Sequence, residues 1–224
     1  MAEEERSALL AGASGLVGRA LLARLLESPR YRRVHALLRR DVPALGAHRK
    51  LTAQIVDFAV LPALPPVDDV FIALGTTIRA AGSRQAFRRV DFDAVLATAR
   101  AGRAAGAKRL LVVSALGADA ASPVFYNRVK GEMQQALAAL GYDSVVIAQP
   151  SLLLGDRHTL GQPLRAGEEW AQRLLRPLLG WLPARVRPIE AGDVAAAMLR
   201  AALEARPGLR ILRSGDMQPR RNRS

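Results

Sequence analysis

The sequence predicts an α/β fold: a doubly wound parallel sheet with a small helical cap near its carboxyl end. Short apolar runs alternate with helical stretches along the chain, which is typical of strand–helix–strand units and not of a β-sandwich or a helical bundle. The runs are also almost continuously apolar, as in strands that a parallel sheet buries on both faces.

The expected strands and helices follow one another in a regular order. The strands are short runs rich in Val, Leu, Ile and Ala, at Ala8–Ala11, Val34–Leu38, Gln54–Val56, Val70–Leu74, Leu110–Ser114, Ser144–Ala148 and Leu209–Leu212. The helices have apolar residues at helical spacing, at Val17–Glu27, Ser83–Ala105, Phe125–Leu140 and Ile189–Leu203. Gly106 and Gly141 follow two of these helices, where helices commonly end.

The chain length and a change in composition after Pro150 indicate the domain organisation. With 224 residues, the chain can form one domain with a substantial core over residues 1–224. Residues 151–188 hold several prolines and both tryptophans, Trp170 and Trp181. We expect this segment to form the cap on the substrate side, with the tryptophans packed inside it.

Composition excludes several other classes of protein. The chain has no cysteine, which excludes disulfides and thiolate metal sites, and His35, His48 and His158 lack the spacing of metal ligands. No apolar run approaches the ~20 residues of a membrane-spanning helix, and the acidic first residues lack the apolar core of a secretory signal. We therefore expect a cytoplasmic protein that binds neither a metal nor a membrane.

The net charge of +13 raises the question of nucleic-acid binding. Only three of the 33 basic residues are lysines, and the arginines are scattered through the predicted helices, as in proteins from GC-rich genomes. No helix-turn-helix, zinc or aromatic RNA-binding signature accompanies them. We interpret the charge as solvated surface and expect a small-molecule substrate as the partner; a monomer and a homodimer both remain open.

A glycine-rich loop lies where the first strand passes into the first helix. Gly12, Gly15 and Gly18 lack the Cβ atoms that would keep the backbone away from a pyrophosphate, and the positive end of the helix faces that anion. A dinucleotide site is predicted from this arrangement, formed by Gly12, Ala13, Ser14, Gly15, Leu16, Val17 and Gly18.

The end of the second strand indicates which nicotinamide cofactor is bound. Enzymes that use NAD usually carry an acidic residue there, whereas an arginine accommodates the 2′-phosphate of NADP. The sequence has Arg39 and Arg40, followed by Asp41. This pattern favours NADP(H) over NAD(H); the alternative is that Asp41 holds an NAD ribose.

Two further turns are expected to contact the cofactor. Asp57 and Phe58 follow the third strand and fit a carboxylate and a ring beside the adenine, although a solvated loop would carry the same residues. The turn after the fourth strand is small, so the nicotinamide ribose and the phosphates can approach its backbone, with hydroxyls as donors: Leu74, Gly75, Thr76 and Thr77.

The candidate catalytic residues follow the fifth strand. Tyr126 and Lys130, at i and i+4 of one predicted helix, share a face. The ammonium stabilises the phenolate, which suits the tyrosine to acid–base catalysis near neutral pH, and it can also hold the ribose hydroxyls. Ser114 ends the strand and is placed to donate a hydrogen bond to a substrate carbonyl oxygen. A surface Tyr/Lys pair is the alternative, because this spacing is common by chance.

These motifs resemble those of the atypical short-chain dehydrogenases/reductases, in the branch of the Tat-interactive oxidoreductase homologues. The similarity runs from about residue 7 to residue 205 and is carried by Gly12–Gly15, Leu74–Thr77, Ala81–Ser83, Phe87–Asp91, Ser114–Asp119, Tyr126, Val129–Glu132 and Pro150–Arg157. The resemblance implies a Rossmann-type core that binds NADPH, with Pro150 beside the cofactor and Ser114, Tyr126 and Lys130 as the catalytic set. It also implies that Arg157, Arg165 and Glu168 lie on the substrate side.

Two positions depart from the family pattern: Ala115 replaces a second serine, and Gln149 replaces the arginine that commonly precedes the proline. The expected function is an NADPH-dependent oxidoreductase that reduces a small carbonyl substrate by hydride transfer, with Tyr126 as the acid. Two alternatives stay open: an NAD(P)H-binding regulatory or scaffold protein with little turnover, and a nucleotide-sugar epimerase-like enzyme. The short segment after Pro150 argues against the epimerase.

Overall fold

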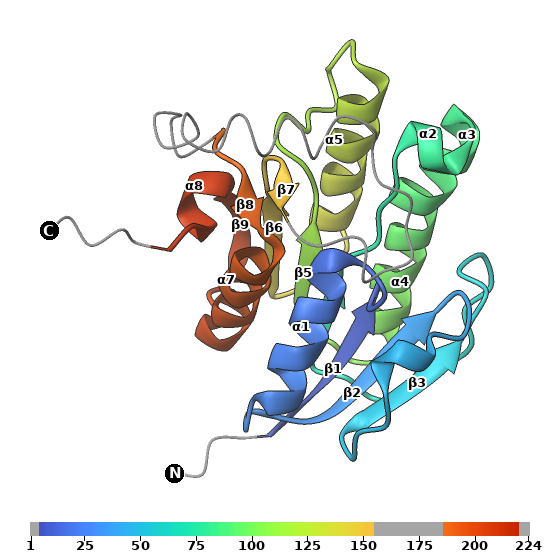
Figure 1. Cartoon of the computed structure of the whole chain (residues 1–224), viewed down its shortest axis with the longest axis vertical. Coiled ribbons are helices and arrows are strands. Elements are labelled where there is room, and N and C mark those ends of the chain that lie inside the picture. Colours follow the sequence, from blue (N-terminus) through green and yellow to red (C-terminus); the bar gives the residue numbers. More distant parts are fainter. Residues whose placement is uncertain (1–4, 155–185, 220–224) are drawn as a thin grey trace, which may run out of the picture.

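The computed structural model describes residues 5–154 and 186–219, and a seven-stranded sheet with helices on both faces forms its centre (Figure 1). The strands run in the spatial order β3-β2-β1-β4-β5-β6-β9, and all neighbours are parallel. Their bounds are β1 (Arg6–Ala11), β2 (Tyr31–Leu38), β3 (Leu51–Ile55), β4 (Asp69–Ile72), β5 (Arg109–Val113), β6 (Ser144–Gln149) and β9 (Gly208–Arg213). The doubly wound, Rossmann-like fold predicted from the sequence is confirmed.

The remaining elements connect the strands and cover the sheet. The helical elements are α1 (Leu16–Glu27), η1 (Pro43–Leu45), α2 (Ile78–Ala81), α3 (Arg84–Arg88), η2 (Arg89–Ala94), α4 (Val95–Ala104), α5 (Phe125–Ala138), α7 (Ala191–Glu204) and α8 (Ser214–Met217). A separate two-stranded sheet joins β7 (Leu153–Leu154) to β8 (Ile189–Glu190).

The sheet has a hydrophobic core on each face, because successive side chains of a strand point in opposite directions. In β1, Ala8 and Leu10 pack in the cluster of α1 and α7, whereas Leu9 and Ala11 pack in the cluster of α4 and α5. Figure 1 shows the same arrangement, with α1 beside α7 and α4 beside α5. The central strands are therefore buried on both faces, as their apolar sequences predict.

The two edge strands differ from the expectation of burial on both faces. The residues of β3 after Leu51 are all exposed, as are Leu209 and Ile211 of β9. The expectation is wrong here because β2 reaches β3 through the short turn η1 and not through a covering helix, while β9 has a neighbouring strand on one side only.

Helix boundaries agree with the sequence in most places and differ in two. The expected helix Ser83–Ala105 is built from α3, the π-helical turn η2 and α4 in succession. The expected helix Ile189–Leu203 begins two residues later, because Ile189 and Glu190 form β8. Residues 155–185, which make up most of the expected cap, lie outside the described residues together with both tryptophans.

The order of the strands reverses at the carboxyl ends of β1 and β4, where an open α/β sheet is expected to form its ligand crevice. The chain leaves β1 toward β2 and β3 on one side and returns to β4 on the other, and ligands of open α/β sheets bind at such switch points. The loops that follow these two strands touch, since the Ala73 N–H donates to the Ala11 carbonyl at 2.8 Å. The glycine loop and the turn after β4 therefore face the same crevice.

Candidate functional site

Two of the three loop glycines are required by the packing of the chain itself. Gly12 has φ +92°, and a Cβ there would lie 2.5 Å from the backbone of Ala73. A Cβ on Gly18 would lie 1.9 Å from the carbonyl oxygen of Gly12. No side chain fits at either position, so the tight turn from β1 into α1 depends on both.

Gly15 is different, because the chain leaves room beside it. A Cβ there would come no closer than 3.5 Å to the Gly12 carbonyl oxygen, an ordinary contact. Gly15 is also the N-cap of α1, and the first turn of that helix has neither a side-chain cap nor an acidic residue. The first N–H groups of the helix have no intrahelical acceptor, so this end fits an anion such as a pyrophosphate.

The other loop residues divide between core and crevice. Ala13 and Val17 are buried in the core that α1 shares with the sheet, so only their backbone can face a cofactor. Ser14 and Leu16 are partly exposed. The dinucleotide site expected at residues 12–18 is thus mostly a backbone surface.

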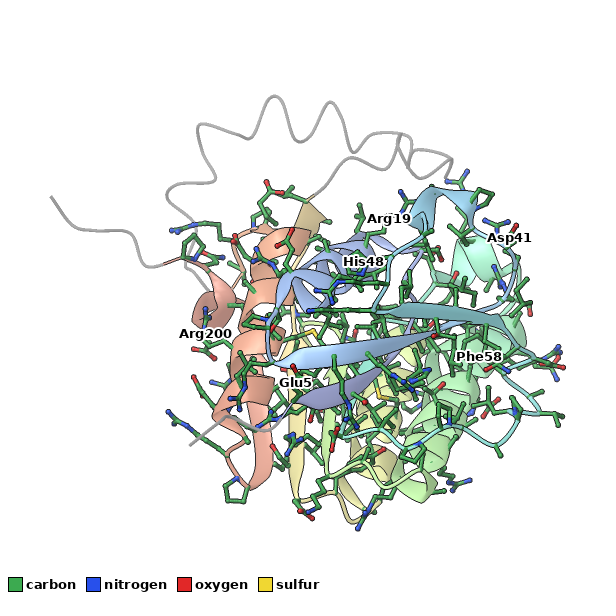
Figure 2. The ribbon with its side chains drawn as sticks, turned by 90° about the horizontal axis from the view of Figure 1, so that it is seen from below. Glu5, Arg19, Asp41, His48, Phe58 and Arg200 are labelled. Carbon is green, nitrogen blue, oxygen red and sulfur yellow. The ribbon has the colours of Figure 1, made fainter. Side chains whose placement is uncertain are left out.

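The residues expected near the adenosine half lie beyond β2 and β3. Arg39 and Arg40 are exposed directly after β2. Asp57 is exposed and accepts a hydrogen bond from the Ala59 N–H at 2.9 Å, while Phe58 is partly buried against the core. Figure 2 shows Phe58 on the side of the molecule formed by β2 and β3, across from Arg200 on α7. Contact of these residues with a cofactor stays a prediction.

The turn after β4 is held by a buried carboxylate. Asp91, in η2, is fully buried and accepts a hydrogen bond from the Thr76 N–H at 2.9 Å. Thr77 caps α2, its oxygen accepting from the Ala80 N–H at 3.1 Å, which leaves its hydroxyl proton free to donate. Leu74 packs against the core, and Gly75 is exposed.

The same carboxylate holds the candidate catalytic lysine. Lys130 is 3% exposed, and its Nζ lies 2.7 Å from Oδ1 of Asp91. Burial raises the pKa of Asp91 above that of an ordinary carboxyl, and the Lys130 ammonium and the Thr76 N–H oppose the rise. Asp91 therefore connects α5 to the turn after β4.

Tyr126 lies one helical turn before Lys130, near the start of α5. Its ring packs on the buried Phe87 of α3, with 5.3 Å between the ring centroids. A surface Tyr/Lys pair, the alternative considered for this spacing, does not describe these residues, because Lys130 is buried and Tyr126 is partly buried.

Ser114 follows β5 and is buried at 6% exposure. Its hydroxyl oxygen accepts a hydrogen bond from Nε2 of Gln134 at 2.5 Å, and Oε1 of Gln134 accepts one from Nε2 of Gln149 at 3.1 Å. Pro150 is buried next to Gln149, and its carbonyl accepts from the Leu116 N–H at 2.9 Å.

The structure brings the candidate residues of the crevice into two connected groups. Lys130 is linked through Asp91 to Thr76, and Ser114 is linked through Gln134 to Gln149. The residues expected on the substrate side, Arg157, Arg165 and Glu168, lie outside the described residues.

Sequence reasoning missed Asp91 and Gln134 as site residues. Gln134 could have been found from its spacing, because it lies four residues after Lys130 on the same face of the helix. Asp91 carries a weaker signal, a carboxylate between Val90 and Phe92 in a helical stretch, and such a charge is buried only when it is paired.

Comparisons with known proteins identify the family. A family model described as NAD(P)H-binding matches residues 12–170. The protein fmp52, mitochondrial, of Aspergillus fumigatus is 37% identical over 218 residues, which cover 94% of this chain and 89% of that protein. The protein HTATIP2 of Rattus norvegicus is 36% identical over 185 residues, which cover 80% of this chain and 73% of that one.

Solved structures agree in fold. An oxidoreductase of the short-chain dehydrogenase/reductase family from Burkholderia thailandensis superposes with a TM-score of 0.69 at 23% identity, covering 97% of this chain and 94% of that one. MoeE5, in complex with UDP-glucuronic acid and NAD, gives a TM-score of 0.70 at 21% identity, covering 92% of this chain and 75% of that one. At these identities the likeness shows the fold alone.

The expected cytoplasmic location is contradicted. The fungal relatives from Aspergillus fumigatus, Candida albicans and Eremothecium gossypii are all named mitochondrial proteins. The expectation rested on composition and on missing secretory and membrane signals, which do not distinguish the cytoplasm from the mitochondrion. Among the described residues, no helix is both long and apolar enough to cross a membrane.

The matches to the family model and to FMP52 and HTATIP2 cover most of this chain. They agree with the Rossmann-like sheet and with the tight glycine turn between β1 and α1. The chain belongs to the NAD(P)H-binding family, among its atypical, oxidoreductase-like short-chain dehydrogenase/reductase members.

Proposed function

We propose that this chain is an NADPH-dependent oxidoreductase that reduces a small carbonyl substrate. The observation that carries the proposal is the environment of Lys130. This side chain is buried beside Asp91, one turn from Tyr126 on α5, and Asp91 also binds the backbone of the turn after β4. Lys130 is thereby linked to the turn after β4, which supports a role for the Tyr126/Lys130 pair beside the expected cofactor.

In the proposed reaction, Tyr126 donates its phenolic proton to the carbonyl oxygen while the carbonyl carbon receives a hydride. NADPH, when bound, supplies that hydride from C4 of its nicotinamide ring. Ser114 donates a hydrogen bond to the same oxygen and stabilises the negative charge that develops there. Lys130, held beside Asp91, places an ammonium group one helical turn from Tyr126.

The preference for NADPH over NADH is supported by Arg39 and Arg40, which are exposed directly after β2. We expect fluorescence titration to give a Kd for NADPH roughly tenfold or more below that for NADH. The double variant R39A/R40A removes most of this difference. Arg33, exposed earlier in the same strand, provides the matched control R33A, which keeps it. A tighter Kd for NADH would contradict the preference.

Turnover is tested by removing the acid. Tyr126→Phe lowers kcat by about 100-fold or more, since a positioned general acid contributes 10²–10⁴, while the Kd for NADPH changes little. Tyr142→Phe is the matched control, because the Tyr142 hydroxyl is buried against the Ala99 carbonyl, away from the crevice. A wild-type protein that binds NADPH but reduces no carbonyl compound supports the regulatory or scaffold alternative and overturns the proposal.

A further inference from the structure

Three neutral side chains form a hydrogen-bonded chain behind the crevice, from Gln149 to Gln134 to Ser114. Gln149 ends β6, Gln134 lies on α5 and Ser114 follows β5. Gln134 is 8% exposed and Ser114 is 6% exposed. A buried amide whose nitrogen and oxygen both have hydrogen-bond partners favours one orientation, because each lost partner costs free energy inside the protein.

The direction of the hydrogen bonds is the same along the chain. Nε2 of Gln149 donates to Oε1 of Gln134, and Nε2 of Gln134 donates to Oγ of Ser114. A hydroxyl has one donor and two acceptor sites, so the Ser114 oxygen is used as an acceptor and its proton is left to donate elsewhere. Hydrogen bonds aligned in this way polarise one another and strengthen the last donor.

One helix carries both the candidate acid–base pair and this amide. Tyr126, Lys130 and Gln134 follow one another at intervals of four residues along α5, so they share a face. The chemical identity of the amide is important here. A carboxylate at position 134 accepts hydrogen bonds only. It would accept a hydrogen bond from the Ser114 hydroxyl, which could then no longer donate to a substrate.

We propose that Gln134, oriented by Gln149, is a positioning residue that keeps the Ser114 hydroxyl as a hydrogen-bond donor toward the substrate oxygen. This inference rests on the proposed reductase function and explains how Ser114 takes part in it. The neutral Gln149, at the position of the family's arginine, completes the chain without adding a charge to the crevice.

The test is a substitution that keeps the shape of Gln134 and reverses its hydrogen bond. Q134E is compared with wild type for NADPH oxidation by pyruvate, a small anionic carbonyl probe, and by 9,10-phenanthrenequinone, an apolar one. We expect kcat to fall by about 100- to 1000-fold, toward the value of S114A, because a lost donor to a developing oxyanion lowers kcat by this order. The KM for NADPH stays near the wild-type value.

Two further readouts separate positioning from structure. Gln135 is exposed on the same helix. Q135E therefore makes the same chemical change at a residue that takes no part in the Gln149–Gln134–Ser114 hydrogen bonds, and we expect it to leave kcat unaltered. At lower pH the introduced carboxyl of Q134E takes up a proton and can donate again, so its activity relative to wild type recovers toward the acid side. Full activity of Q134E at neutral pH overturns the inference, because the amide would then face the other way.

A second measurement does not depend on turnover. It applies if no carbonyl probe is reduced, a result that would contradict the proposed reductase function. The melting temperatures of S114A, Q134M and the double variant are compared, with CD spectra and the Kd for NADPH as controls for folding. If the hydrogen-bonded chain exists, the double variant loses less than the sum of the single losses, because either change alone breaks the same contact. If the two losses in melting temperature simply add, Ser114 and Gln134 do not interact and the inference is wrong, whether or not the protein turns over a substrate.

Discussion

At the scale of single residues, the three loop glycines differ in the space beside them. Gly12 and Gly18 have no room for a Cβ because the backbone of this chain lies against them, whereas Gly15 has room. The sequence predicts all three as a cofactor motif, since the spacing alone cannot separate glycines needed for folding from those needed for a ligand. Only the distances between loop atoms make that separation.

This difference predicts opposite effects of two alanine substitutions. Gly18→Ala forces the Gly12 carbonyl to move and costs about 1–3 kcal/mol of stability, as overpacking does. Gly15→Ala leaves the unfolding free energy near the wild-type value and raises the Kd for NADPH roughly tenfold or more, because its Cβ would extend into the space proposed for the pyrophosphate. Urea unfolding and NADPH titration measure the two effects.

Gly192 supplies the control for this pair. It lies in α7, and a Cβ added there would have no neighbouring atom within 4 Å, so Gly192→Ala leaves the Kd unchanged and does not lower stability. Unchanged NADPH affinity in Gly15→Ala would mean that the pyrophosphate lies elsewhere.

At the scale of elements, the sequence predicts which strands and helices are present better than it predicts irregular turns within them. The central strands and the helices α1 and α5 are found within a few residues, because their apolar periodicity is decided locally. The π-helical turn η2 within the expected helix Ser83–Ala105 is not predicted from the local pattern. It contains Asp91, whose partners are distant in sequence: Lys130 of α5 and Thr76 of the turn after β4. The candidate site was therefore predicted in its motif residues and missed in the residues that connect them.

The element η2 carries a prediction of its own. Asp91→Ala leaves the buried Lys130 ammonium unpaired and costs about 3–5 kcal/mol of stability. Asp91→Asn keeps the shape of the side chain and removes its charge, so this variant loses less stability than Asp91→Ala. Its turnover still falls, because the ion pair that holds Lys130 is lost. Differential scanning calorimetry and NADPH oxidation measure the two quantities.

Asp93 lies in the same turn and is exposed, so Asp93→Asn is the matched control and keeps both stability and activity. Equal stability of wild type and Asp91→Ala would show that the ion pair does not hold the turn.

At the scale of the whole molecule, the two ends of the sheet have separate roles. The expected crevice lies at the carboxyl ends of the strands, while the amino ends share a polar cluster around one buried carboxylate. Its members are the first residues of four adjacent strands: Arg6, Tyr31, Asp69 and Arg109. Asp69 is fully buried, accepts a hydrogen bond from the Tyr31 hydroxyl at 2.5 Å and pairs with the Arg109 guanidinium. Nη1 of Arg6 lies 3.6 Å from Oδ2 of Asp69.

Burial and the Asp69 charge raise the pKa of Tyr31, so its phenol stays protonated and donates to that carboxylate. Tyr31→Phe removes a hydrogen bond to a charged acceptor and lowers the unfolding free energy by about 1.5–3 kcal/mol. Tyr142→Phe removes a hydroxyl that is also buried but whose acceptor is the neutral Ala99 carbonyl, so its cost is smaller, about 1 kcal/mol. In urea unfolding we expect this order, with the Kd for NADPH unchanged in both variants. A change in Kd caused by Tyr31→Phe would contradict the separation of the two ends, because it would show that the polar cluster influences the crevice through the length of the sheet.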